Sequence, residues 1–145
     1  MAEEPKRIIG WREWVAIPDL GIHQIKAKVD TGARTSALHA EDIRIMKKGN
    51  KRFVRFKIRP FQRNARIEIE ARAPLVEKRQ VRSSSGHETI RPVILIPILL
   101  ADEMQPIEVT LVNRDMMGFR MLLGREAIRG RFIVDPARSF TLGRI

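Results

Sequence analysis

Apolar and polar residues alternate along several segments of this chain. The alternation is clearest over residues 24–29, 54–59 and 66–70, where every second side chain is apolar. A period of two residues is typical of a β-strand that buries one face and exposes the other. Further strands are predicted in apolar segments at residues 93–99, 107–112, 121–123 and 131–134. The pattern therefore predicts a chain made mostly of β-structure.

The second and third alternating segments are predicted to form a β-hairpin. The residues between them, 60–64, are turn-prone because they include a proline and an asparagine. In such a hairpin, Arg55 and Lys57 can lie near the carboxylates of Glu70 and Glu68 on the facing strand. Cross-strand ion pairs are therefore expected there.

Helical patterns are rare in the sequence. The best is a short one at residues 124–129, closed by Gly130, a residue that suits a C-terminal stop. Many short strands separated by Gly and Pro favour an all-β fold. We expect a closed or nearly closed β-barrel with one short helix near its C-terminal end.

The length of 145 residues is that of one domain. Hydrophobic residues make up 43% of the chain and charged residues 31%, which excludes the compositions of disordered and collagen-like chains. We expect residues 1–7 to form a flexible N-terminal tail and residues 8–145 to fold as a single domain.

The chain is strongly basic, with a net charge of +11. The excess is confined to residues 44–82, which hold 14 Lys or Arg against 3 Glu, while the other residues hold 14 of each sign. A basic face with interleaved phenylalanines can bind RNA by phosphate contact and stacking, or an acidic protein by ion pairing. A solvated sheet face would have the same composition, so all three interpretations stay open. Between the two partners, an acidic protein or peptide is favoured over nucleic acid.

The sequence has no cysteine, which excludes disulfides, thiolate zinc sites and a cysteine nucleophile. The longest apolar run, residues 93–101, is about half a membrane span and contains Pro97, so no transmembrane helix is predicted. Residues 1–7 are not followed by the apolar segment of a secretory signal. We therefore expect a cytoplasmic protein without a membrane partner.

A candidate catalytic motif, Asp30-Thr31-Gly32-Ala33, follows directly after the strand predicted at residues 24–29. Small residues around one carboxylate at a strand end expose the acid, and Gly32 lets another backbone come close. Thr31 can hydrogen-bond across such a contact. Asp and Gly are also frequent in ordinary turns, so this motif alone leaves both interpretations open.

A second motif, Leu123-Gly124-Arg125, begins a short helix, and its glycine lies 94 residues after Asp30. An Asp-Thr-Gly-Ala loop followed by such an apolar-Gly-Arg segment resembles the retroviral-type aspartic proteases, the retropepsins. Between the two motifs, the small residues of segment 82–88 lie where that family has its glycine-rich flap. The order and spacing of all three segments agree with the resemblance.

The resemblance implies a catalytic site shared by two subunits. Each chain would supply one catalytic aspartate, Asp30, so activity would require a homodimer. The residues implied to support the active site are Thr31, Gly32, Leu123, Gly124 and Arg125. Those implied to bind a peptide or protein substrate are Ala33, Arg34, Ser83, Ser84, Ser85, Gly86 and His87. Neither a metal nor a cofactor is implied.

A bacterial and archaeal family, labelled ATP-dependent zinc proteases and often associated with glutamate-adding ATP-grasp ligases, is similar at residues 9–15, 28–40 and 82–92. The residues support neither part of that label. A zinc site needs about three ligands, whereas Asp30 and His39 would supply two, and no His-Glu-x-x-His is present. No glycine-rich phosphate loop followed by a lysine is present either.

One position departs from the retroviral pattern. That pattern has an acid two residues after the glycine, where it pairs with the arginine of the second motif, whereas this chain has Arg34. Arg125 is thus expected to lose its partner. The basic residue suggests an acidic or glutamate-rich substrate, or a fold that has kept its shape and lost proteolysis.

Two functions follow from the sequence. The favoured one is an aspartic endopeptidase of retropepsin type, in which a water molecule is activated between the two Asp30 carboxylates of a homodimer. The alternative is a non-catalytic binding module on the same barrel, which uses the basic 44–82 face to bind an acidic protein or RNA.

Overall fold

The computed structural model describes residues 5–61, 66–82, 85–114, 116 and 118–144. The strands are β1 (Arg7–Ile9), β2 (Arg12–Ile17), β3 (Ile22–Asp30), β4 (Ser36–His39), β5 (Glu41–Lys48), β6 (Lys51–Ile58), β7 (Ile69–Arg82), β8 (Glu88–Leu100), β9 (Glu103–Val112), β10 (Met121–Gly124) and β11 (Phe132–Val134). The helix α1 covers Arg125–Ile128, and a 3-10 turn covers Pro18–Leu20. No helix in this described part is long and apolar enough to cross a membrane.

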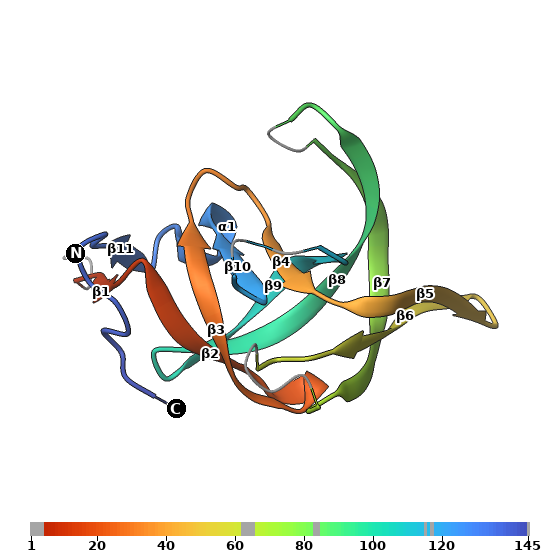
Figure 1. Ribbon diagram of the computed structural model, residues 1–145, viewed down its shortest axis with the longest axis horizontal. Helices are drawn as coiled ribbons and strands as arrows, with labels where there is room; N and C mark the ends of the chain where they lie inside the picture. The colour runs from red at the N-terminus through yellow and green to blue at the C-terminus, as the bar shows by residue number, and fades with distance from the viewer. Residues whose placement is uncertain (1–4, 62–65, 83–84, 115, 117, 145) are drawn as a thin grey trace.

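The strands form a sheet that returns on itself. Within the described residues, nine strands follow the order β2-β3-β10-β4-β9-β8-β7-β6-β5, and β1 pairs with β11 separately. β2 also pairs with β8, at Ala16 and Leu99, so the sheet from β2 to β8 closes into a ring (Figure 1). The closed all-β fold with one short helix is confirmed.

The core lies inside this ring. Along β3, Ile25 and Ala27 are buried while the lysines between and after them remain half-buried, as the period of two predicts. Leu38 of β4, Ile98 of β8 and Met121 of β10 are fully buried in the same cluster. Burying each such side chain contributes about 1.5–3 kcal/mol, so the core fixes the strands that carry the site.

β10 is inserted between β3 and β4, although it follows both in sequence by more than eighty residues. It runs parallel to β3 and antiparallel to β4. This crossing brings the second motif of the sequence beside the end of β3, where the first motif begins.

Two long hairpins extend beyond the ring (Figure 1). β5 and β6 are joined by a turn at Gly49-Asn50, where Gly49 has a φ of 63° that favours glycine. β7 and β8 form the other hairpin, which reaches the same end of the molecule as the loop after β3. The flap expected from the sequence corresponds to the tip of this second hairpin.

The hairpin predicted from residues 54–59 and 66–70 is the pairing of β6 with β7. Arg55 contacts Glu70 at 2.5 Å, as expected, and this contact lowers the pKa of Glu70 through the hydrogen bond from Arg55. Lys57 also lies near Glu70, opposite it in the register, whereas Glu68 pairs with Arg59 at 3.0 Å. The ion pair of Lys57 is with Asp42 of β5, at 3.3 Å, because a third strand stands on its other side.

Most of β7 was not predicted as a strand. Beyond residue 75, its side chains are exposed or half-buried on both faces, so no face selects apolar residues and the period of two disappears. A strand that leaves the ring to form a hairpin in solvent gives this weak pattern.

Glu13 of β2 ties the C-terminal segment to the ring. Its carboxylate is fully buried and accepts hydrogen bonds from the backbone N–H groups of Gly10 at 2.7 Å, Thr141 at 3.0 Å and Leu142 at 3.1 Å. Hydrogen bonds to a charged acceptor contribute about 1.5–3 kcal/mol each before burial is counted. Residues 137–144 are thereby held across the outside of β2.

Candidate active site

Asp30 is the last residue of β3 and stands opposite Gly124, the last residue of β10. Its carboxylate oxygen Oδ1 accepts a hydrogen bond of 3.1 Å from the N–H of Gly32, and its carbonyl accepts one of 3.2 Å from Ala33. Asp30 is half-buried, whereas Thr31 and Gly32 are exposed. The loop therefore presents a carboxylate whose position is fixed by its own backbone.

Gly124 allows the second motif to approach this loop. A Cβ atom at residue 124 would lie 2.6 Å from the carbonyl carbon of Thr35 and 2.8 Å from the carbonyl oxygen of Arg34. The following N–H groups bind the loop: that of Arg125 donates to the Ala33 carbonyl at 2.8 Å. Only glycine fits between the two segments, which explains its place in the motif.

Ser36 adds a further bond at this junction. Its hydroxyl oxygen accepts a 3.0 Å hydrogen bond from the N–H of Gly124, and its carbonyl accepts one of 3.3 Å from Thr110. Ser36 is buried and was not singled out from the sequence, because a lone serine at the start of a strand has no distinctive pattern.

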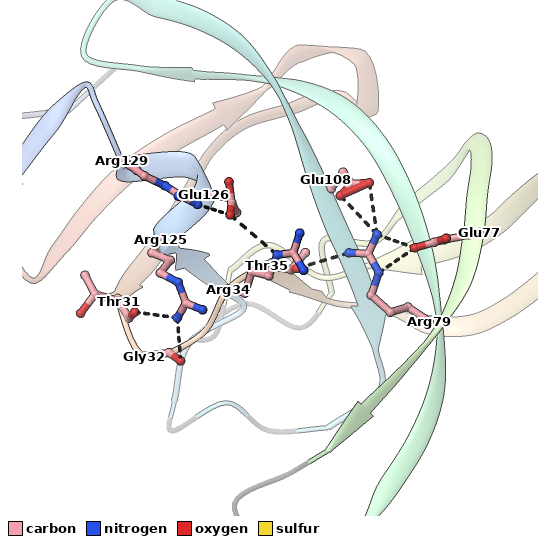
Figure 2. Close-up of polar contacts among 10 residues, drawn as sticks. All are labelled: Thr31, Gly32, Arg34, Thr35, Glu77, Arg79, Glu108, Arg125, Glu126 and Arg129. Carbon is pink, nitrogen blue, oxygen red and sulfur yellow. Dashed lines mark hydrogen bonds and ion pairs between the residues drawn. The ribbon is translucent and has the colours of Figure 1, made fainter.

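Arg125 has partners, contrary to the expectation that it would lack one. Its guanidinium donates to the carbonyl oxygens of Thr31 and Gly32, both at 3.3 Å (Figure 2). A sequence does not show which backbone carbonyls the fold brings near an arginine. Only an acidic side chain was therefore considered as the partner of Arg125. Arg125 thus braces the loop that carries Asp30 without a carboxylate at residue 34.

Arg34 pairs with Glu126 of α1, at 3.7 Å. Glu126 also contacts Arg129 one turn further along the chain (Figure 2). The Arg34 side chain is 76% exposed, so this pair contributes only about 0–1 kcal/mol. Its guanidinium therefore remains available to a ligand, and Glu126 is a neighbour that sequence reasoning missed.

Arg79 joins the flap hairpin to the same loop. From β7 it donates to the hydroxyl of Thr35 at 3.3 Å, to Glu77 at 2.7 Å and to Glu108 of β9 at 3.3 Å (Figure 2). The hydrogen bond to Glu77 raises the pKa of Arg79, so the guanidinium stays charged. No signal in the sequence marked Arg79, because it lies in the unpredicted part of β7.

The remaining predicted site residues are placed as follows. Leu123 is buried beneath the loop, and Ala33 is half-buried within it. Ser85, Gly86 and His87 are exposed where β7 turns into β8, and Gly86 has a φ of 85°. Ser83 and Ser84 lie outside the described residues. The structure thus assembles Asp30, Gly32 and the second motif in direct contact, with the described flap residues on the neighbouring hairpin.

His39, a possible metal ligand in the sequence, contacts other groups in the fold. His39 is buried at the end of β4, with Nδ1 2.8 Å from the carbonyl oxygen of Arg114 and Nε2 3.7 Å from Glu41. Across residues 5–61, 66–82, 85–114, 116 and 118–144, no group of three His, Cys, Asp or Glu could hold a metal ion. The residues around Asp30 therefore do not fit a zinc site.

Ion pairs neutralise part of the basic stretch 44–82. Examples are Arg59 with Glu41 at 3.1 Å and Arg82 with Glu88 at 2.7 Å. The end of the β5–β6 hairpin differs, since Lys47 stands opposite Arg52 and Lys48 opposite Lys51. These four residues, the basic tip, form no ion pair with the described residues.

Comparisons with known proteins match nearly the whole chain. A family model described as "RimB-like: Retropepsin-like aspartic endopeptidase RimB" matches residues 8–144. Proteins named probable alpha-L-glutamate ligase are 44% identical over 140 residues in Desulfotalea psychrophila and 46% identical over 138 residues in Parasynechococcus marenigrum, covering 97% and 95% of this chain. The chain spans about 30% of the length of these curated relatives.

A solved structure has the same fold. The crystal structure of a protein of unknown function from Legionella pneumophila matches with a TM-score of 0.77 and 32% identity, over 95% of this chain and 99% of that chain. Together with the family match over residues 8–144, this agrees with the resemblance found from the two motifs. The chain belongs to the RimB-like family, whose model describes a retropepsin-like aspartic endopeptidase.

Proposed function

We propose that this protein is an aspartic endopeptidase in which the Asp30 carboxylates of two identical subunits share one active site. The observation that supports this function best is the contact between the two motifs at Asp30 and Gly124. A loop held by Gly124, Arg125 and Ser36 keeps a half-buried carboxylate in place without any contribution from the substrate. Catalysis by general acids and bases requires such preorganisation.

The exposed residues beside Asp30 support the homodimer. Thr31 and Gly32 directly follow the carboxylate and are exposed in the single chain, although their carbonyls are held by Arg125. A rigid, exposed backbone next to a single carboxylate suits contact with a second copy of the same loop. The two-fold axis would then pass between the two Asp30 side chains.

Two carboxylates in such a site cannot both ionise easily, so they share a proton. The ionised carboxylate takes a proton from water, and the hydroxide adds to the carbonyl carbon of the scissile peptide. The protonated carboxyl gives its proton to the carbonyl oxygen, which forms a tetrahedral intermediate. The first carboxyl then gives the proton it took from water to the nitrogen, and a hydroxyl of the intermediate returns a proton to the second carboxylate. The C–N bond breaks, and an acid and an amine leave.

A peptide library tests this function. We expect wild-type protein to cleave library members between about pH 4 and pH 7, and Asp30→Ala to cleave none of them, because the variant has no carboxylate to activate water. Cleavage sites are identified by mass spectrometry of the products. Both proteins are first compared by circular dichroism, so that loss of folding is not mistaken for loss of chemistry. Equal cleavage by the two proteins, or none by either, would exclude the proposal.

The alternative of a non-catalytic binding module has one observation in its favour. Like charges stand opposite one another at the basic tip, which destabilises the hairpin unless an anionic partner covers it. An acidic protein would fit. In that case the peptide library gives no cleavage, while binding of an acidic protein weakens steeply between about 50 mM and 200 mM salt.

We further propose that the substrate is acidic, such as a glutamate-rich peptide. Arg34 stands two residues after Gly32, and a cavity of about 370 Å³ beside it is also lined by Arg129 and Arg131. Glu108 and Glu126 line the same cavity and balance part of this charge. A guanidinium pairs well with a carboxylate, so the three arginines favour an acidic side chain.

Arg34→Gln is expected to lower kcat/KM for a glutamate-rich peptide by about tenfold and for a neutral peptide by less than about twofold, because one charge-assisted bond is lost. Arg52→Gln, at the remote basic tip, removes the same charge and serves as the control. The measurement is kcat/KM of each variant on both peptides. Equal rates of wild-type protein on the two peptides would refute the substrate assignment without affecting the proposed chemistry.

A further inference from the structure

A second basic surface lies away from the catalytic loop, on the outside of β2 and β3. It is a pocket of about 350 Å³ beside Trp14 and Phe140. Its lining includes four cationic side chains, Arg12, Lys26, Arg120 and Arg144, and the described residues that line it include no acid. Lys26 stands four residues before Asp30 along β3, about 13 Å at the usual rise of a strand. The pocket is therefore distinct from the proposed active site.

The positive charge of this pocket is not neutralised by the described residues. None of the four cations forms an ion pair within residues 5–61, 66–82, 85–114 and 118–144. The Nε atoms of Arg12 and Arg120 are buried and have no hydrogen-bond acceptor there. An unsatisfied buried donor is unfavourable, so an anion that draws these groups into hydrogen bonds would be bound favourably.

Aromatic rings stand among the cations. Trp14 and Phe140 are stacked, with ring centroids 5.2 Å apart and planes inclined by 20°. The Arg12 guanidinium lies 4.8 Å from the Phe140 ring, and that of Arg144 lies 5.3 Å from the Trp14 ring. Phe61 lines the same pocket. Flat rings and flat guanidinium groups both offer surfaces on which a planar ligand can stack.

The pocket is held together by the C-terminal segment. The N–H of Phe140 donates to the carbonyl of Arg12 at 2.9 Å, and Glu13 holds Thr141 and Leu142 just beyond. Phe140 has a φ of 52°, a left-handed conformation that is unfavourable for a bulky residue. This strained conformation places the Phe140 ring against Trp14.

We propose that this pocket binds a single-stranded segment of nucleic acid. Phosphates would contact Arg12, Lys26, Arg120 and Arg144, and unpaired bases would stack on the Phe61 ring and on faces that the Trp14–Phe140 stack leaves uncovered. Four cations exceed the charge of one phosphate, so the surface fits two or three consecutive nucleotides better than one. An acidic peptide would satisfy the cations but make no use of the stacked rings, and a duplex keeps its bases out of reach.

The test uses a fluorescein-labelled single-stranded RNA of about eight nucleotides, a length within the range bound by small single-strand sites. We measure anisotropy and the fluorescence of Trp11 and Trp14, the two tryptophans of the chain. We expect binding with quenched tryptophan emission and a log–log salt slope of about −2 to −3, as three or four phosphate contacts predict. A duplex of equal length is expected to bind at least about tenfold more weakly.

Matched variants locate the contact. Arg120→Gln with Arg144→Gln is expected to weaken RNA binding by about tenfold or more, because two charge-assisted contacts are lost. Lys48→Gln with Lys51→Gln at the basic tip removes the same charge and is expected to change the affinity by less than about twofold. Asp30→Ala should bind RNA like wild type, which separates this proposal from the proposed hydrolysis.

Several results would overturn the proposal. Absence of binding at about 50 mM salt would do so, and so would equal losses in the pocket and tip variants, because they would indicate attraction by net charge alone. A duplex or a glutamate-rich peptide that binds as tightly as the single strand would also contradict it. Quenching by adenosine monophosphate without binding of the strand would assign the pocket to a free nucleotide instead.

Discussion

Subunits that carry Asp30→Asn are expected to inactivate the wild-type subunits with which they pair. The amide cannot take a proton from water, so the pure variant should lose about 10³-fold or more of the peptidase activity. In a mixed dimer, one carboxylate remains but has no partner with which to share a proton. If subunits exchange at random, an equal mixture should keep only about a quarter of its chains in wild-type dimers.

The measurement is peptidase activity against the fraction of variant in the mixture, after incubation long enough for subunit exchange. A shared site predicts that activity falls with the square of the wild-type fraction, because both subunits must be wild type. Arg52→Gln mixed in the same proportions is the control and should leave the activity unchanged. A linear fall would mean that each chain works alone, and the homodimeric site would be abandoned.

Gly124→Ala is expected to destabilise the fold strongly. The added Cβ would lie 2.6 Å from the carbonyl carbon and 2.7 Å from the oxygen of Thr35, which are backbone atoms that cannot rotate away. Forcing β10 away from the loop would also strain the bonds from Gly124 to Ser36 and from Arg125 to Ala33. We expect a loss of about 3 kcal/mol or more in the free energy of unfolding.

Urea unfolding followed by circular dichroism measures this loss, with Gly32→Ala as the matched control. A Cβ at residue 32 would meet only the Oδ1 atom of Asp30, at 3.3 Å, so that variant should remain within about 1 kcal/mol of wild type. A Gly124→Ala protein as stable as Gly32→Ala would show that the second motif does not need to approach the loop so closely.

The parts of the site that could be predicted from the sequence are those in which one residue type alone fits. Gly124 is required by a backbone contact, and Asp30 places a carboxylate opposite it at the end of β3, so each marked its own segment. Arg79 and Glu126 could not be found in this way. Their roles depend on which distant residues the fold brings near them, and an exposed arginine or glutamate has the same appearance wherever it lies.

The count of charged residues along the sequence likewise did not locate the basic surfaces of the fold. The excess of lysine and arginine over residues 44–82 was counted correctly, but several of its members pair with acids, such as Arg55 with Glu70. The pocket beside Trp14 was not predicted, because residues 12, 26, 120 and 144 are far apart in sequence and lie outside the basic stretch. A sum over a segment measures composition, whereas a binding surface depends on the residues that the fold brings together.

The insertion of β10 between β3 and β4 has a consequence for the timing of assembly during synthesis. Asp30 is synthesised before the residues that complete its loop, 124–126, which follow more than ninety positions later. Contacts so distant in sequence form slowly, since a long loop must close before they are gained. The Asp30 loop of a nascent chain therefore stays unassembled until residues 124–126 have also been synthesised.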